Sequence, residues 1–190
     1  MVKKDKLTVL LDMDGVITNI VSGIELLYDT KFDFTKGESR FTKLLGITMA
    51  ELSLDLNQSK FWTDLRPTKY MHEIFQILIE YGLFSRTILC TQGIFMPEAH
   101  AGRLRWIQHH CPEFWIRKAY ISIQDKSMLA KGDKLLIDDY DKNCSNFMKA
   151  GGWAIEFMAD WNPLQIGNPV DRLRSELENL IVGEKEDEEI

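Results

Sequence analysis

Two acidic residues, Asp12 and Asp14, follow an apolar run near the start of the chain, and Gly15 comes directly after them. Residues 7–11 are all apolar or β-branched, which is typical of a buried strand in a parallel sheet. Side chains two apart on a strand point the same way, so both carboxylates are expected at its carboxyl end. Carboxylates this close resist joint ionisation unless a cation neutralises them. The spacing therefore predicts a site for a hard divalent cation, Mg²⁺, with oxygen ligands.

The same residues have a plainer interpretation, because Asp and Gly are common in turns and can simply end a strand. An Asp-x-Asp-Gly sequence directly after a five-residue apolar strand is more specific than an Asp-x-Asp pair alone. It also falls at the edge where open α/β sheets bind ligands. A functional site is therefore the favoured interpretation.

A second acidic pair, Asp138 and Asp139, ends the apolar segment 134–139. Two acidic pairs at two strand ends are hard to explain as turns, which favours one shared site. Asp138 is expected to share the cation with Asp12. Asp139 is expected to bind it through water or to orient its neighbours.

Neutral donors suited to a phosphate follow another predicted strand, at 87–90. Thr91 and Gln92 come directly after it and precede Gly93. A hydroxyl together with exposed backbone N–H groups can bind phosphate oxygens. Thr91 alone would be an ordinary strand-end threonine, but the strand-to-glycine context occurs twice, which favours phosphate binding.

A lysine near these strand ends can neutralise both a phosphate and a carboxylate. Lys126 follows the predicted strand 119–123, and Lys131 lies in the loop after it. Lys134 begins the next strand and so belongs at the opposite edge of the sheet. Lysines are usually solvated, so the sequence leaves the choice between Lys126 and Lys131 open, with Lys126 favoured.

The elements that position these residues follow from apolar periodicity. Strands are predicted at 7–11, 87–90, 119–123, 134–139 and 153–157, and helices at 17–28, 41–45, 48–55, 70–81, 97–110, 143–150 and 170–181. This alternation predicts an α/β fold with a mainly parallel sheet. We expect a main domain of residues 1–28 and 67–182, a small helical cap at 29–66 over the carboxylates, and a disordered acidic tail at 183–190.

Composition narrows the class of protein. The 190 residues are 45% hydrophobic and 27% charged, with a formal charge of −6, which argues against a long nucleic acid as partner. No apolar run approaches membrane-spanning length, and the N-terminus leaves no room for a signal peptide. Three cysteines without metal-ligand spacing indicate free thiols in a reducing compartment, and the histidines are expected at the surface. We therefore expect a soluble, cytoplasmic protein, with the formation of a homodimer left open.

The segment 10–16, LLDMDGV, resembles the first motif of the haloacid dehalogenase (HAD) superfamily of phosphohydrolases. Thr91, Lys126 and the second acidic pair then match its later motifs in order. The resemblance implies a three-layer Rossmann-like fold and a phosphatase. It implies that Asp12 attacks phosphorus to give an aspartyl-phosphate and that Asp14 is the general acid and base. It also implies that Asp12, Asp14 and Asp138 hold Mg²⁺.

Within this superfamily the chain looks most like the 5′(3′)-deoxyribonucleotidase branch, through segments 59–67, 88–91 and 124–139. It departs from that branch at residues 19–20, 92–93 and 140–141. The expected function is hydrolysis of (deoxy)nucleoside monophosphates, with Ile20, Phe41 and Trp62 as candidates for the substrate pocket. Two alternatives stay open: a phosphatase for a sugar phosphate or another small phosphoester, and a non-catalytic binding or regulatory protein on the same scaffold.

Overall fold

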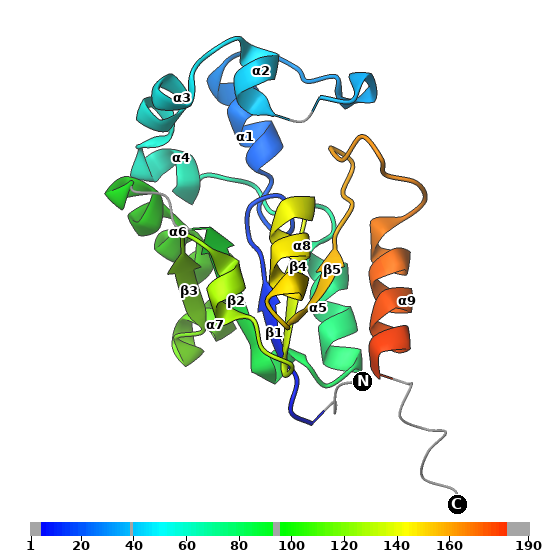
Figure 1. The fold of residues 1–190 in the computed structure, drawn as a ribbon. Coiled ribbons are helices and arrows are strands. Elements are labelled where there is room, and N and C mark those ends of the chain that lie inside the picture. The colour runs from blue at the N-terminus through cyan, green and yellow to red at the C-terminus, as the bar shows by residue number, and fades with distance from the viewer. Residues whose placement is uncertain (1–4, 39, 93–95, 182–190) are drawn as a thin grey trace, which may run out of the picture.

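The computed structural model of the 190-residue chain describes residues 5–38, 40–92 and 96–181. The predicted acidic tail and Gly93 lie outside these ranges. The fold is a parallel sheet with helices on both faces, and further helices stand beyond one end of the strands (Figure 1). The prediction of an α/β fold with a parallel sheet is therefore confirmed.

Within the described ranges, the sheet has the five strands β1 (Thr8–Leu11), β2 (Thr87–Gln92), β3 (Tyr120–Ile123), β4 (Lys134–Asp138) and β5 (Trp153–Glu156). Their spatial order is β3-β2-β1-β4-β5, and every neighbouring pair is parallel. After β3 the chain crosses β1 to begin β4, so the strand order reverses beside β1. Such a reversal opens a crevice at the carboxyl ends of the strands, where α/β proteins bind ligands.

The α-helices are α1 (Ile20–Leu27), α2 (Phe41–Leu45), α3 (Met49–Leu56), α4 (Ser59–Thr63), α5 (Met71–Glu80), α6 (Pro97–His110), α7 (Pro112–Arg117), α8 (Asp141–Lys149) and α9 (Pro169–Ile181). The part of the chain that the structure describes also has the short 3₁₀ helices η1 (Phe34–Lys36), η2 (Phe84–Arg86) and η3 (Lys126–Leu129). Among the described residues, no helix combines the length and the apolar character needed to cross a membrane.

Alternation along β1 divides the apolar core between the two faces of the sheet. Leu10 packs with Cys90 and Leu136 of the flanking strands and with Phe147 of α8. On the other side, the larger cluster includes residues of β1, α5, α6, α7 and α9. A central strand covered on both faces explains why residues 7–11 are continuously apolar.

Several predicted boundaries were off: the strand expected at 87–90 continues through Gln92, and the helix expected at 17–28 begins only at Ile20. Residues 13–18 form a tight turn in which the Met13 carbonyl accepts the backbone N–H groups of Val16, Ile17 and Thr18. Asn19 then caps α1 by accepting from Ser22 N at 3.0 Å. Apolar spacing could not distinguish this buried turn from a helix.

Helices α2, α3 and α4 lie in the segment predicted as a cap, beyond the strand ends (Figure 1). The contact between α4 and α6 is close, since a Cβ on Gly102 would lie 2.4 Å from the Ser59 carbonyl oxygen. Trp62 of α4 is buried and donates to the Leu56 carbonyl at 2.7 Å. The division into a main domain and a cap stays a prediction.

Candidate active site

Three carboxylates meet at the carboxyl ends of β1 and β4. Asp12 follows β1 directly, Asp138 is the last residue of β4, and Asp139 comes next. The backbone fixes this arrangement, because Asp12 N donates to the Ile137 carbonyl at 2.8 Å. Each carboxylate offers an oxygen, and the three oxygens lie within 4.8 Å of one another. Asp12 of the first acidic pair therefore converges with both residues of the second pair.

Gly15 makes this convergence sterically possible. Its φ is +91°, a conformation that L side chains rarely adopt. A Cβ at this position would lie 1.9 Å from Oδ2 of Asp139. Any side chain here would push Asp139 away from the other two carboxylates.

Lys126 joins two of the carboxylates. Its Nζ donates to Asp12 Oδ1 and to Asp138 Oδ2, each at 2.6 Å, and its side chain is buried. It begins η3, where the turn is capped by Asp125. By contrast, Lys131 is exposed, and Lys134 contacts Thr8 at the opposite ends of the strands. The structure thus puts Lys126, the favoured candidate, beside the carboxylates, while its role stays a prediction.

The ionisation of this cluster reflects burial and crowding. Burial raises the pKa of Asp12 well above its ordinary value, Lys126 opposes this, and the other three carboxylates add to it. Burial and Asp138 raise the pKa of Asp139 to about 7. Burial alone would lower the pKa of Lys126, but Asp12 and Asp138 outweigh it and raise the pKa. A further cation nearby would favour ionisation of all the carboxylates.

Asp14 lies apart from this group and has its own partners. Its Oδ1 accepts from the Thr18 hydroxyl at 3.1 Å, and its Oδ2 accepts from the Thr91 hydroxyl at 3.2 Å. Oδ2 also pairs with Nη2 of Arg103. The structure therefore groups Asp139, rather than Asp14, with Asp12 and Asp138, while the metal roles expected of these residues remain untested predictions.

Arg103 on α6 is a site residue that the sequence reasoning missed. It is buried, and its guanidinium carbon lies 4.0 Å from the centroid of the Trp62 ring. Its Nε and Nη1 are buried and have no hydrogen-bond partner among the described residues. The available signal was spacing, because Arg103 lies four residues after Ala99 and three before Trp106, on the buried face of this helix.

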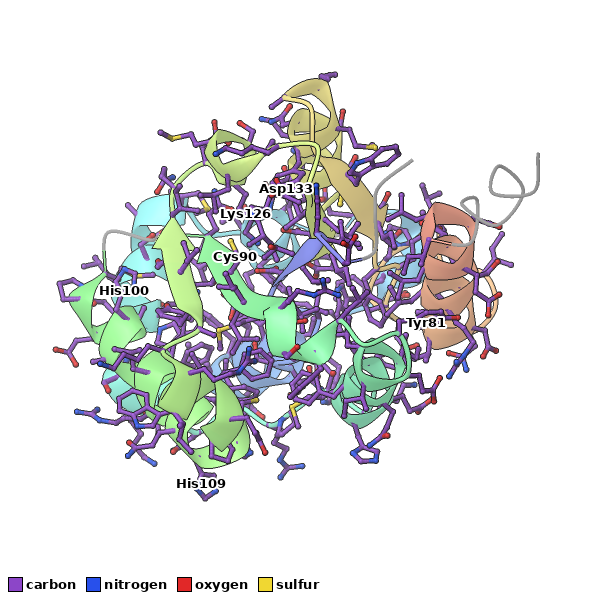
Figure 2. The ribbon with its side chains drawn as sticks, turned by 90° about the horizontal axis from the view of Figure 1, so that it is seen from below. Tyr81, Cys90, His100, His109, Lys126 and Asp133 are labelled. Atoms are coloured by element: carbon purple, nitrogen blue, oxygen red, sulfur yellow. The ribbon has the colours of Figure 1, made fainter. Side chains whose placement is uncertain are left out.

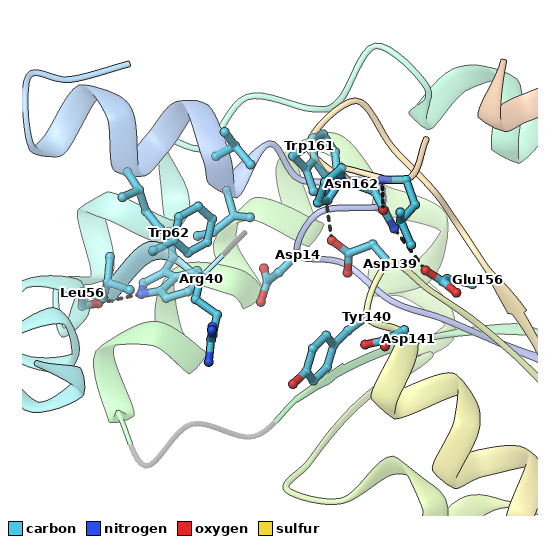
Figure 3. Close-up of a pocket in the computed structure, with 16 residues that line it drawn as sticks. Asp14, Arg40, Leu56, Trp62, Asp139, Tyr140, Asp141, Glu156, Trp161 and Asn162 are labelled. Atoms are coloured by element: carbon cyan, nitrogen blue, oxygen red, sulfur yellow. Dashed lines mark hydrogen bonds between the residues drawn. The ribbon is translucent and has the colours of Figure 1, made fainter. Parts of the chain in front are cut away.

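A cavity of about 470 Å³ opens beside these residues (Figure 3). Ile20, Phe41 and Trp62 all line it together with Asp14 and Asp139, so the three pocket candidates do share one cavity with the acidic residues. The rest of its lining comes from α1, from Arg40 and Leu56, and from residues 140–141, 156 and 161–164.

Other predicted residues lie away from the acidic cluster. Gln92 is exposed at the end of β2, where its Nε2 is 3.4 Å from the Gln124 carbonyl oxygen. Among the described residues, the group of side chains that could hold a metal ion contains no histidine. In Figure 2, His109 lies at the outer margin of the molecule, whereas Lys126 lies in its interior. Cys90, Cys111 and Cys144 are free thiols, as expected.

Two further donors hold the acidic residues in place. Asn143 of α8 donates to both carboxylate oxygens of Asp138, at 3.2 and 3.1 Å. Trp161 donates from Nε1 to Asp139 Oδ2 at 2.9 Å. Both lie in segments where the sequence showed only an ordinary helix and a loop, so no local pattern marked them.

The donor set fits a hard divalent cation. Four carboxylates, of Asp12, Asp14, Asp138 and Asp139, face two fixed cations, Lys126 and Arg103. With all six ionised, the cluster has two negative charges in excess. Oxygen ligands and this excess suit Mg²⁺, which coordinates few carboxylates and keeps several waters.

A model of the protein family described as 5′ nucleotidase, deoxy (pyrimidine), cytosolic type C protein matches residues 6–182. A search of curated proteins found no match.

Several solved structures are similar. A HAD hydrolase of family IA, variant 3, from Entamoeba histolytica HM-1:IMSS is 14% identical, with a TM-score of 0.48, over 87% of this chain and 98% of that one. A HAD family hydrolase from Deinococcus radiodurans R1 with bound phosphate and sodium is 16% identical, with a TM-score of 0.46. The match covers 91% of this chain and 93% of that one. A magnesium complex of a HAD family enzyme from Bacteroides thetaiotaomicron is 12% identical, with a TM-score of 0.40. The match covers 83% of this chain and 97% of that one. Similarity this low says nothing about the substrate of this chain.

Proposed function

This chain belongs to the family described as 5′ nucleotidase, deoxy (pyrimidine), cytosolic type C protein, and we propose that it is a Mg²⁺-dependent hydrolase of (deoxy)nucleoside monophosphates. Membership makes it a phosphatase of the HAD type, so the non-catalytic alternative falls away. The substrate, the metal and the roles of individual residues are the content of the proposal. We also propose that the protein is cytoplasmic.

Asp12 is the proposed nucleophile. It attacks phosphorus, the bond from phosphorus to the leaving oxygen breaks, and an aspartyl-phosphate forms. Lys126 bonds to one oxygen of Asp12, which orients the carboxylate and leaves its other oxygen for attack. A fixed ammonium here also offsets the charge that gathers on the phosphoryl group in the transition state.

Asp14 is the proposed general acid and base. It protonates the leaving oxygen in the first step and takes a proton from the water that hydrolyses the aspartyl-phosphate in the second. Hydrogen bonds from Thr18 and Thr91 and the ion pair with Arg103 hold its carboxylate at the pocket. Thr91, whose hydroxyl donates to Asp14, is the neutral donor that we assign to the phosphoryl group.

Asp12, Asp138 and Asp139 are the side chains that would hold the metal, with Asp14 as the alternative ligand expected from the sequence. When bound, Mg²⁺ supplies charge neutralisation at the phosphoryl oxygens.

The observation that supports the proposal is a cavity with an acidic side, lined by Asp14 and Asp139, and an apolar side, next to Asp12 with its partner Lys126. A phosphoryl group fits the acidic side when a divalent cation is present. The aliphatic and aromatic lining, which includes Ile20 and Phe41, suits a flat apolar leaving group better than a bare sugar.

The experiment is phosphate release across matched phosphomonoesters. We expect the purified chain to hydrolyse deoxynucleoside monophosphates with kcat/KM at least tenfold above ribose 5-phosphate and glycerol phosphate, a difference that base stacking can supply. Equal rates for nucleotides and sugar phosphates would move the assignment to the sugar-phosphate alternative. No release from any of them would contradict the assigned catalytic roles.

The metal requirement is tested in the same assay. Excess chelator is expected to abolish turnover and Mg²⁺ to restore it. Ca²⁺ is expected to inhibit, because it is larger and takes more ligands, so it would engage both oxygens of Asp12. Full activity in chelator would contradict the metal assignment.

A further inference from the structure

Trp161 contacts both parts of the site. It lies in the segment between β5 and α9, and its ring is half-buried and lines the cavity. Its Nε1 donates to Oδ2 of Asp139, and in Figure 3 Trp161 and Trp62 stand on different sides of Asp14. One side chain thus contacts both the acidic cluster and the space for the leaving group.

The neighbours of Trp161 hold it firmly although the segment has no regular secondary structure. Asp160 pairs with Lys69 at 2.6 Å and accepts from the Tyr70 hydroxyl. Asn162 donates from its backbone N to the Ala159 carbonyl at 2.8 Å and from its side chain to Glu156 at 3.0 Å. A residue fixed on both sides presents its ring in one orientation, as a preorganised wall requires.

Asp139 depends on this indole. Its carboxylate lies over Gly15 and accepts a hydrogen bond from the indole N–H. Trp161 engages Oδ2 of this carboxylate, which also offers an oxygen within 4.8 Å of oxygens of Asp12 and Asp138. Donors that orient the carboxylates of a metal site commonly change metal affinity by roughly 10–100-fold when removed.

We propose that Trp161 has two separable roles: its indole N–H positions Asp139 for the divalent cation, and its ring is the wall against which a flat leaving group packs. The second role rests on the proposed nucleotidase function, whereas the first does not. Trp161 is therefore a positioning residue toward the metal and a specificity-determining residue toward the substrate.

Two substitutions separate the roles. Trp161→Phe keeps a flat ring and removes the N–H, while Trp161→Leu removes both. Trp153→Phe is the matched control, since Trp153 donates from Nε1 to the Gly132 carbonyl at 3.0 Å, away from the pocket. Calorimetry of Mn²⁺ binding tests the positioning of Asp139 without requiring turnover. The ratio of kcat/KM for a deoxynucleoside monophosphate to that for ribose 5-phosphate tests the contact of the ring with the leaving group.

We expect Trp161→Phe to weaken Mn²⁺ binding by about tenfold and to leave the substrate ratio within about twofold of wild type. Trp161→Leu is expected to weaken binding equally and to lower the ratio at least fivefold or so, as loss of stacking would. Trp153→Phe should change neither quantity. Melting temperatures of the variants report whether each still folds.

A double-mutant cycle tests whether Trp161 acts through Asp139. In an Asp139→Ala background, Trp161→Phe should weaken Mn²⁺ binding by less than about twofold, because the acceptor is gone. A full tenfold loss in that background would overturn the positioning role, as would unchanged Mn²⁺ binding in Trp161→Phe alone.

An unchanged substrate ratio in Trp161→Leu would overturn the wall role. If the wild-type enzyme shows no preference for nucleotides at all, the proposed function and the wall role both fail. The Mn²⁺ measurement still decides the positioning role in that case, so the two failures are distinguishable.

Discussion

The two ends of the cavity are constrained very differently. Next to the phosphoryl end, where Asp14 and Asp139 line the cavity, Asp12 is 5% exposed, Lys126 2% and Asp138 0%. At the leaving-group end, Tyr140 is 51% exposed and Leu164 73%. Charged groups are buried where the chemistry is proposed, and apolar groups are exposed where a leaving group is proposed to bind.

This contrast has a physical reason. Buried charges cost free energy unless they are paired in fixed geometry, so the phosphoryl end tolerates little variation. Exposed apolar side chains around a cavity cost little, gain free energy when a substrate covers them, and can be exchanged without disturbing the sheet. We infer that the phosphoryl end sets the reaction and the leaving-group end sets the choice of substrate.

Among the substitutions proposed for the phosphoryl end, Asp12→Asn is expected to cause the largest loss of turnover. An amide is a poor nucleophile, so turnover should fall by roughly a thousandfold or more, measured as phosphate release. Lys126 keeps its bond to Asp138, so the melting temperature should change little. Asp133→Asn, at the other ends of the strands beside Lys134, is the control and should keep wild-type turnover. Activity within about tenfold of wild type in Asp12→Asn would exclude Asp12 as the nucleophile.

Removal of the buried ammonium comes next. Lys126→Ala leaves Asp12 and Asp138 without their shared partner, so we expect a loss of about a hundredfold in kcat and a lower melting temperature. Lys131→Ala removes an exposed lysine from the same loop and should leave kcat within about twofold. A larger loss of kcat for Lys131→Ala than for Lys126→Ala would reverse the assignment.

The boundary between the two ends is tested at Arg103. Arg103→Lys keeps the charge but loses the planar fork that both pairs with Asp14 and stacks on Trp62. We expect kcat/KM to fall by about tenfold for nucleotides and sugar phosphates alike, because the pairing acts on Asp14 rather than on the leaving group. Arg105→Lys, on the exposed side of the same helix, is the matched control. A loss confined to nucleotides would instead assign Arg103 to the leaving-group end.

The mildest change tests the leaving-group end alone. Phe41 lines the cavity and packs on Phe32, with ring centroids 5.5 Å apart. Phe41→Ala should lower nucleotide kcat/KM by about five- to tenfold and leave ribose 5-phosphate nearly unchanged, because stacking contributes about 1–3 kcal/mol. Phe34→Ala removes a ring that also packs on Phe32 but does not line the cavity, and serves as control. Parallel losses for both substrates would show that Phe41 acts on folding rather than on selectivity.

Trp62 is a less informative position, although the sequence made it an equal candidate. It is 2% exposed, donates to the Leu56 carbonyl and supports Arg103. Truncation to alanine would therefore disturb packing on α4 and α6 together with any contact to substrate. Only the structure distinguishes the partly open Phe41 from the buried Trp62.

The amino-acid sequence alone determined the sheet and its acidic edge. Continuous apolar runs ending in Asp12 and Asp138 specify buried parallel strands, because such runs are stable only when both faces are covered. Once the strands are parallel, their carboxyl ends lie at one edge, so residues far apart in the sequence must meet. The apolar runs are local sequence patterns, and the shared edge follows from the parallel arrangement of the strands. Both can be inferred from the sequence.

Tertiary structure alone decided which side chains support that edge. Arg103, Asn143 and Trp161 contact the acidic residues from α6, α8 and the segment before α9, and each lies in an ordinary sequence context. Their contacts depend on how helices and loops pack against the sheet, which hydrophobic periodicity does not encode. The separation of Asp14 from the other carboxylates has the same origin, because its partners Thr91 and Arg103 come from β2 and α6.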